Sequence, residues 1–316
     1  MGRQQETKRL PIHVFHGVLA DWSVDSRLDR LYVPTVAFSG FLDRLTSRYV
    51  PAESCGPDDI ALTIDDSTMA AAEAALLARG RGHDVTLFLN PHQIIAQTPY
   101  FFTILGIAID RLVERARKTD PRASWRSPHF LQLRQETRAQ IAALDGPALD
   151  GAMRAFLERW DLDWPDVPAG VRAIDPQTLS RLTSAGVQIG NHGWSHTDIA
   201  AMSPDQLWND ISMAQRWLED ATSQRITSYA VPFGLVAPPP EVLTRLPGTC
   251  MLVDGTRPVG PLAPGLVNRL DITDDIVARA RVRQPGFGAV PRSQPERRGW
   301  RVTMKQLLRG GRSRRG

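Results

Sequence analysis

Short β-rich segments alternate with helical patterns along most of the 316-residue chain. This alternation predicts parallel strands joined by crossover helices, because parallel neighbours cannot be connected by a tight turn. A chain of this length accommodates one α/β barrel or two smaller domains. The expected strands lie at residues 12–15, 60–64, 85–89, 187–190, 228–231, 250–253 and 266–270.

Capping residues mark the starts of two of the expected helices. Asp175 followed by Pro176 has the form of an N-cap with proline at the first helical position, and Gly186 ends that helix. Ser203 and Gln206 have the spacing of a capping box. We therefore expect helices to follow directly at both places.

Residues 91–173 break this rhythm, because the stretch is far too long for a connection between a strand and a helix. It carries amphipathic patterns at about 104–115 and 131–160. We expect a helical insertion within a domain of residues 1–285. Its aromatic cluster at residues 98–102 is expected to serve in packing.

The positive charge of the chain is concentrated in its last residues. The net charge is +4, but residues 291–316 hold nine Lys or Arg and one Glu, so the rest sums to −4. We expect residues 286–316 to form a basic, flexible tail, with peripheral contact to an anionic membrane surface as an alternative role. No nucleic-acid reader motif is recognisable. The first residues lack the apolar run of a secretory signal, which favours the cytoplasm, including the inner face of its membrane.

Three polar clusters come directly after predicted strands. Asp65 and Asp66 follow the second strand, His192 and His196 follow the fourth, and Pro232 follows the fifth. In a parallel α/β barrel the carboxyl ends of the strands converge on one face. We therefore expect these side chains to share a site.

Two imidazoles four residues apart suit a divalent metal, although a capping or hydrogen-bonding role is also open. A site with two His ligands requires an anionic third ligand and leaves one position for water. Asp66 would be that ligand while Asp65 takes a proton from the water. The same aspartates are also in the position of helix caps.

The segments ALTIDDS (61–67), GNHGWSH (190–196) and YAVPFG (229–234), in this order, resemble the first three motifs of the polysaccharide deacetylase family, also known as the NodB homology domain or carbohydrate esterase family 4. The resemblance covers residues 11–272. It implies a deformed (β/α) barrel and a hydrolase that removes acetyl groups from an N-acetylated aminosugar.

The resemblance also implies residue roles. Asp65 would be the catalytic base, and Asp66, His192 and His196 would bind a divalent metal, expected to be Zn²⁺. The backbone N–H of Phe233 would stabilise the oxyanion beyond the turn at Pro232.

The chain departs from the family pattern at three places. Ser67 replaces the usual Gly of the first motif, and Ala230 stands where an Arg often supports the base. No His follows His196, so the usual acid near the C-terminus is absent. We expect Arg269, on the final strand, to replace the missing Arg as the partner of Asp65. His16 ends the first strand and is expected to make a structural hydrogen bond, although it could approach the site.

Asn90, at the end of the third strand, and Trp194 are candidate sugar contacts, because an amide and an aromatic face suit a pyranose ring, but both could equally be structural. The expected substrate is an N-acetylated glycan or a lipid-linked sugar precursor. Two alternatives stay open: a catalytically inactive glycan-binding protein of the same fold, and a metal hydrolase of another amide or an ester.

Overall fold

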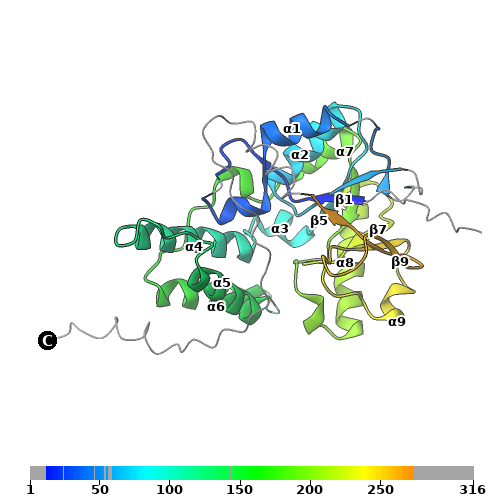
Figure 1. The fold of residues 1–316 in the computed structure, drawn as a ribbon. Coiled ribbons are helices and arrows are strands. Elements are labelled where there is room, and N and C mark those ends of the chain that lie inside the picture. Colours follow the sequence, from blue (N-terminus) through cyan, green and yellow to red (C-terminus); the bar gives the residue numbers. More distant parts are fainter. Residues whose placement is uncertain are drawn as a thin grey trace, which may run out of the picture. The chain divides into compact units, whose positions relative to one another are not determined.

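The computed structural model describes residues 12–272, apart from positions 24, 46, 53–54, 56–58, 143 and 145. A sheet of neighbouring parallel strands forms its centre (Figure 1). In spatial order these strands are β1 (Ile12–Phe15), β4 (Ala61–Asp65), β5 (Thr86–Leu89), β6 (Gln188–Asn191), β7 (Ser228–Ala230) and β8 (Thr249–Leu252). Every residue of β4 and β5 is buried, as expected for parallel strands that are covered on both faces.

The last described segment of the chain, which contains two short strands, pairs with both edge strands of this sheet. β10 (Leu266–Asn268) pairs in parallel with β8, and β11 (Leu270–Asp271) pairs in parallel with β1. Only Arg269 lies between them, and its N–H donates to the Leu252 carbonyl. One extended segment therefore closes the sheet into a deformed barrel, which confirms the predicted fold class. β9 (Gly260–Ala263) is added to β10 in an antiparallel direction.

Helices cover the outside of the barrel, and α1, α2, α7 and α8 contact one another in that order (Figure 1). The four helices are α1 (Thr35–Leu42), α2 (Met69–Gly80), α7 (Pro176–Ser184) and α8 (Pro204–Thr222). A fifth helix, α9 (Pro240–Leu243), contacts α8. Their apolar faces and the strands form the largest core cluster, which includes Phe15, Ile64 and Leu87. This burial is the main source of the stability of the barrel.

Both predicted helix starts are confirmed. The Asp175 carboxylate accepts a hydrogen bond from the Thr178 N–H, and Pro176 is the first residue of α7. Ser203 and Gln206 form the complete capping box at the start of α8. A third cap supports the site, because the Thr68 hydroxyl accepts from the Ala71 N–H and so sets the point where the chain leaves β4 and begins α2.

The stretch between β5 and β6 is largely helical. It contains α3 (Pro91–Ala96), α4 (Phe101–Arg117), α5 (Pro128–Ile141), α6 (Gly146–Arg159) and the 3-10 turn η3 (Ala169–Val171). Helices α4, α5 and α6 gather beside the barrel around an apolar cluster of their own (Figure 1). The pattern at 131–160 is divided between two helices, because Gly146 has a φ of 43° and the following proline cannot continue a helix from before it.

The remaining described elements are short: η1 (Leu28–Leu31), η4 (Ile199–Ala201), and β2 (Val18–Leu19) paired with β3 (Val33–Pro34). Among the described residues, no helix combines the length and apolar character that crossing a membrane requires. The predicted basic tail at 286–316 lies outside the described residues, as does the expected domain boundary at 285.

Candidate active site

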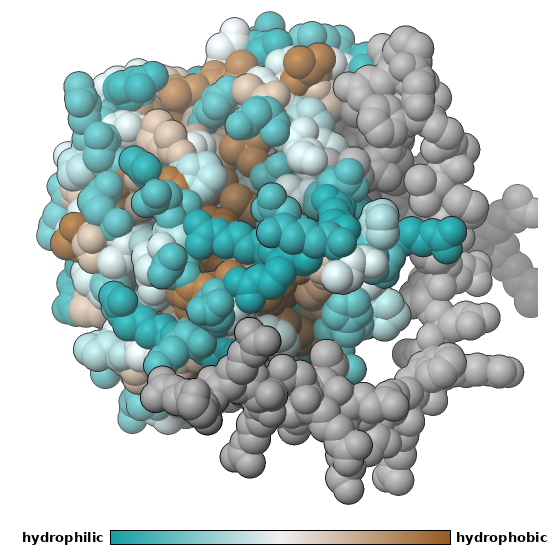
Figure 2. All heavy atoms as spheres, turned by 90° about the vertical axis from the view of Figure 1, so that its left-hand side faces the viewer, coloured by the Kyte–Doolittle hydropathy of each residue, from teal (hydrophilic) through white to brown (hydrophobic). Residues whose placement is uncertain are grey.

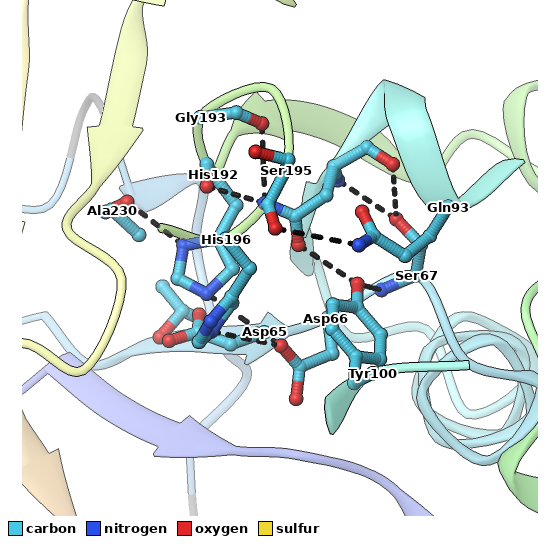
Figure 3. A network of polar contacts seen from close by, with 12 residues as sticks. Asp65, Asp66, Ser67, Gln93, Tyr100, His192, Gly193, Ser195, His196 and Ala230 are labelled. Carbon is cyan, nitrogen blue, oxygen red and sulfur yellow. Dashed lines mark hydrogen bonds and ion pairs between the residues drawn. The ribbon is translucent and has the colours of Figure 1, made fainter. Parts of the chain in front are cut away.

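The polar residues expected to form the site lie at the carboxyl ends of neighbouring strands. Asp65 ends β4, His192 follows β6, and Pro232 follows β7. Because these strands are parallel, their ends meet on one side of the barrel. Figure 3 shows the side chains of His192 and His196 directed toward Asp66.

Asp66, His192 and His196 form the cluster that suits a metal. One potential ligand atom from each lies within 4.8 Å of the others. The Nε2 atoms of His192 and His196 lie 3.7 Å and 3.4 Å from Asp66 Oδ1. All three side chains are buried. Two imidazole nitrogens and one carboxylate oxygen are a donor set that zinc accepts, with a coordination position left for water or substrate.

A backbone contact orients His192 for this role. Its Nδ1 lies 2.8 Å from the Ala230 carbonyl oxygen, which can only accept a hydrogen bond. The proton therefore lies on Nδ1, and the lone pair of Nε2 faces Asp66. Such a contact from the second ring nitrogen fixes the tautomer and the orientation of many metal-binding histidines. The backbone of Ala230 thus supports the cluster, although its side chain replaces the Arg of the family motif.

The electrostatics of the cluster are incomplete without a cation. Burial lowers the pKa of His192 and brings the pKa of His196 well below its usual value, so both imidazoles are neutral. Burial, together with the neighbouring Asp65 carboxylate, also raises the pKa of Asp66 to about 7, and the opposing effect of His16 is too small to offset it. Asp66 Oδ1 and His196 Nδ1 have no hydrogen-bond partner among the described residues. A divalent cation would supply the missing positive charge, and the three residues fit one.

Backbone strain is concentrated at the same place. Asp66, His196 and Phe233 have φ values of 79°, 62° and 63°, in the left-handed region that side chains disfavour. They are half of the six non-Gly described residues with positive φ. Such conformations cost about 1–3 kcal/mol each and are retained mainly where function requires a particular direction of the side chain.

Asp65 is held by the residue that closes the barrel. The Nη1 and Nη2 atoms of Arg269 donate to its two carboxylate oxygens, both at 2.7 Å, and Nη1 also donates to Thr63 Oγ1 at 3.1 Å. Burial alone would raise the pKa of Asp65, but the charge of Arg269 and its two hydrogen bonds lower it to about 2. Asp65 is therefore a carboxylate, and Arg269 occupies the place of its expected partner.

Asn90 supports the loop that carries His192 and His196. Its side-chain amide donates to the carbonyls of His192 and Gly193, and its oxygen accepts from the Tyr100 hydroxyl at 2.8 Å. The Tyr100 oxygen in turn accepts from the Ser67 N–H at 2.7 Å. Asn90 is 0% exposed, so its predicted sugar contact is wrong, because both ends of its amide are engaged inside the protein.

Ser67 also has a specific role at the position where the family usually has Gly. Its Oγ accepts from the Asn90 N–H at 2.8 Å, and its hydroxyl donates to the Asn90 carbonyl at 3.2 Å. The departure from the motif therefore adds two contacts between the loops that follow β4 and β5. The φ angle at Ser67 is not positive, so this position does not require glycine.

The helical stretch after β5 contributes an aromatic wall to the site. The rings of Tyr100 and Phe102 lie 5.5 Å and 5.3 Å from the His196 ring, and the Phe233 ring lies 4.7 Å from it on the opposite loop. The sequence suggested only packing for the cluster that contains Tyr100. The contacts of the Tyr100 hydroxyl with Ser67 and Asn90 could not be predicted, because the sequence shows only a run of aromatic residues there.

The other predicted residues lie around this centre. Pro232 is buried, whereas Phe233 and Trp194 are partly exposed. The Phe233 N–H donates no hydrogen bond within the part of the chain that the structure describes. His16, which directly follows β1, is partly exposed and lies close enough to the carboxyl groups of Asp65 and Asp66 to interact with them electrostatically. The predicted contact of Trp194 with sugar stays a prediction.

Comparison with known proteins supports the fold and the family. Residues 53–242 match the family described as polysaccharide deacetylase, a span that holds all three motifs. IcaB from Ammonifex degensii has a similar structure, with a TM-score of 0.51, 14% sequence identity, and coverage of 86% of this chain and 95% of IcaB. No curated protein matches the sequence significantly.

Two more distant structures complete this comparison. The deacetylase domain of BpsB from Bordetella bronchiseptica has a TM-score of 0.47 at 8% identity, with coverage of 84% and 96% of the two chains. BA0330 from Bacillus anthracis, assigned to the polysaccharide deacetylases, has a TM-score of 0.48 at 10% identity over 83% of this chain. The chain spans only 64% of the length of BA0330. On the match of its sequence over residues 53–242, the chain belongs to the polysaccharide deacetylase family of carbohydrate-active hydrolases.

Proposed function

We propose that this chain is a metal-dependent deacetylase that removes the acetyl group from an N-acetylated aminosugar of a glycan or a lipid-linked glycan precursor. The observation that carries the proposal is the buried Asp66, His192 and His196 cluster directly beside a carboxylate that Arg269 holds ionised. This combination, in a chain of the polysaccharide deacetylase family, supports amide hydrolysis more strongly than glycan binding alone.

Each group has a distinct task in the proposed reaction. Asp66, His192 and His196 would hold the cation, for which zinc is the best match to the donor set. Zinc bound there supplies Lewis acidity toward the acetyl carbonyl and makes water more acidic. Asp65 accepts a proton from the attacking water, and the Phe233 N–H donates to the oxygen that develops negative charge. The C–N bond then breaks, and acetate and a free amine leave.

The leaving amine also needs a proton, and we assign this donor role to His16. It lies at the end of β1, whose neighbour in the barrel is β4, which ends in Asp65. Its side chain is partly exposed, and it makes no hydrogen bond within the described residues. The structural hydrogen bond expected for His16 is therefore wrong, which leaves the imidazole available to the substrate.

The proposed acid is tested by His16→Gln, which keeps a polar side chain but cannot transfer a proton. We expect kcat for acetate release to fall by about 10²-fold, because general acids contribute at least this much. The zinc content, measured by inductively coupled plasma mass spectrometry, should be unchanged. His13→Gln is the matched control, because His13 lies on the same strand but bonds to Tyr49 at 2.6 Å. Equal turnover in wild type and His16→Gln would remove His16 from the reaction.

The proposed activity itself is tested by metal removal together with His192→Ala. The chain is treated with a chelator, reloaded with zinc, and assayed for bound zinc and for acetate released from a panel of N-acetylated glycans. We expect activity to disappear with the metal and to return with it. At a free zinc concentration of 100 times Kd, the metal should raise the free energy of unfolding by about 2.7 kcal/mol.

His192→Ala should lose both zinc and activity, whereas His129→Ala should keep both, because His129 is exposed on α5. Acetate release that survives chelation would contradict the proposed chemistry. A zinc-loaded protein that releases no acetate from any glycan would instead support the inactive binding protein. Release from an ester alone would change the substrate class.

A further inference from the structure

Two separate segments bring three arginine side chains close enough to interact electrostatically near the active site. Arg134 and Arg138 are four residues apart on α5, so they lie on the same face of that helix. The Cζ atom of Arg138 lies 4.5 Å from the centre of the Phe233 ring, which itself contacts His196. Arg27 comes from the segment before η1. One aromatic ring therefore separates Arg138 from the His196 side chain, and Arg138 belongs to an arginine cluster with Arg27 and Arg134.

The cluster holds positive charge in a partly desolvated position. Arg27 is only 7% exposed, and its Cζ atom lies 5.5 Å from the centre of the Trp125 ring. Burial, followed by the charges of Arg134, Arg30 and Arg138, lowers the pKa of Arg27 to about 9. The charges of these arginines thus repel one another at close range.

Neighbouring carboxylates offset only part of this charge. The charge of Asp110 acts on Arg27, and its oxygens accept from the Ser26 hydroxyl and from the backbone N–H groups of Arg27 and Leu28. Asp198 acts on Arg138 but also accepts from the Ala200 N–H at 3.0 Å. Among the described residues, the guanidinium groups of Arg27 and Arg134 form no hydrogen bond or ion pair.

A phosphate group matches this arrangement. Guanidinium groups bind phosphate through pairs of parallel hydrogen bonds, and they are more weakly hydrated than ammonium groups and therefore suited to partly buried sites. Leaving such charges without an anion is costly, because burial removes their water. A neutral sugar would provide no compensation.

We propose that Arg27, Arg134 and Arg138 bind a phosphate or diphosphate group carried by the substrate, so that this chain acts on a phosphorylated N-acetylated sugar and not on a neutral polymer. The inference rests on the proposed deacetylase function and specifies its substrate class. The Phe233 ring, between the cluster and His196, would then separate the phosphate from the acetamido group.

The surface on the side of these helices is partly hydrophilic. Figure 2 shows the side of the molecule on which Figure 1 places α4, α5 and α6, and hydrophilic side chains form a band across its centre between hydrophobic areas.

The test compares N-acetylglucosamine 1-phosphate with N-acetylglucosamine, using isothermal titration calorimetry on the zinc-loaded protein. We expect the wild type to bind the phosphorylated sugar at least about ten-fold more tightly, because charge-assisted pairs are strong hydrogen bonds. Arg134→Gln/Arg138→Gln should lose this preference while its affinity for the neutral sugar is unchanged. Arg154→Gln is the matched control, since Arg154 stacks on Trp164 at 4.7 Å outside the cluster.

A salt titration of the wild type keeps the test valid if the double variant does not fold. Affinity for the phosphorylated sugar should fall as salt rises, whereas affinity for the neutral sugar should not. Equal affinity for the two sugars would overturn the inference. So would a preference that persists in the folded double variant, since the phosphate would then be bound at the metal.

The two proposals fail in different ways. Deacetylation of neutral oligosaccharides without any phosphate preference would sink the inference and leave the proposed function intact. Arginine-dependent binding of the sugar phosphate, without acetate release from any substrate, would support the anion site and remove the proposed function. Tighter binding of a sugar that bears only a carboxylate would overturn the assignment to phosphate.

Discussion

Asp65→Asn is expected to reduce kcat for acetate release by about 10²–10⁴-fold, the usual contribution of a general base. The amide keeps the shape of the side chain but cannot accept the proton of water. Asp66, His192 and His196 remain, so the bound zinc should stay at the wild-type level. The measurement is kcat at saturating substrate together with the zinc content of the same sample.

Asp254→Asn is the matched control for this substitution. Asp254 also follows a barrel strand, and its carboxylate accepts from Arg257 at 2.9 Å, but it lies outside the cluster. Its replacement should change kcat little. Turnover of Asp65→Asn within a few-fold of wild type would show that another group takes the proton. Loss of zinc from that variant would show that Asp65 serves as a ligand.

Arg269→Met is expected to have the largest effect on stability. Arg269 is 2% exposed, and its removal leaves the buried Asp65 carboxylate without a partner. Breaking one side of a buried ion pair costs about 3–5 kcal/mol in the free energy of unfolding. Urea denaturation measures this loss. Arg81→Met is the control, because the Arg81–Asp43 pair is solvent-exposed and should contribute at most about 1 kcal/mol.

A double variant separates this explanation from a simple loss of packing. Asp65→Asn/Arg269→Met leaves no buried charge, so it should be more stable than Arg269→Met alone, although it remains inactive. If the second substitution brings no recovery, the loss in the single variant comes from packing against Phe88 and the strand, and not from the unpaired carboxylate.

The seven barrel strands could be predicted from the sequence because each is an apolar or β-branched run in a fixed rhythm with helical segments. The caps at Asp175 and Ser203 were equally readable, since their chemistry is local. The division of 131–160 at Gly146 was not predicted, because an amphipathic pattern can continue across a break in the backbone.

The surroundings of the site were less predictable, because they depend on contacts distant in sequence. Asn90 had the position of a sugar ligand, and only the fold shows that Tyr100 and the His192 carbonyl occupy its amide. The left-handed conformations of Asp66 and His196 could not be predicted from residue type, because Asp and His adopt this conformation more often than most residues but still only rarely. The arginine cluster likewise joins residues from two segments, and no local motif marks it.

Closure of the barrel by the final strand has a consequence for biosynthesis. Of the described strands, β1 is made first, yet its partner β11 leaves the ribosome last. Contacts of such large sequence separation form slowly, because a long loop must be closed first. Arg269 arrives with that last segment, so a nascent chain cannot hold Asp65 in its working position until the barrel is complete. We therefore expect incomplete chains to have no hydrolytic activity.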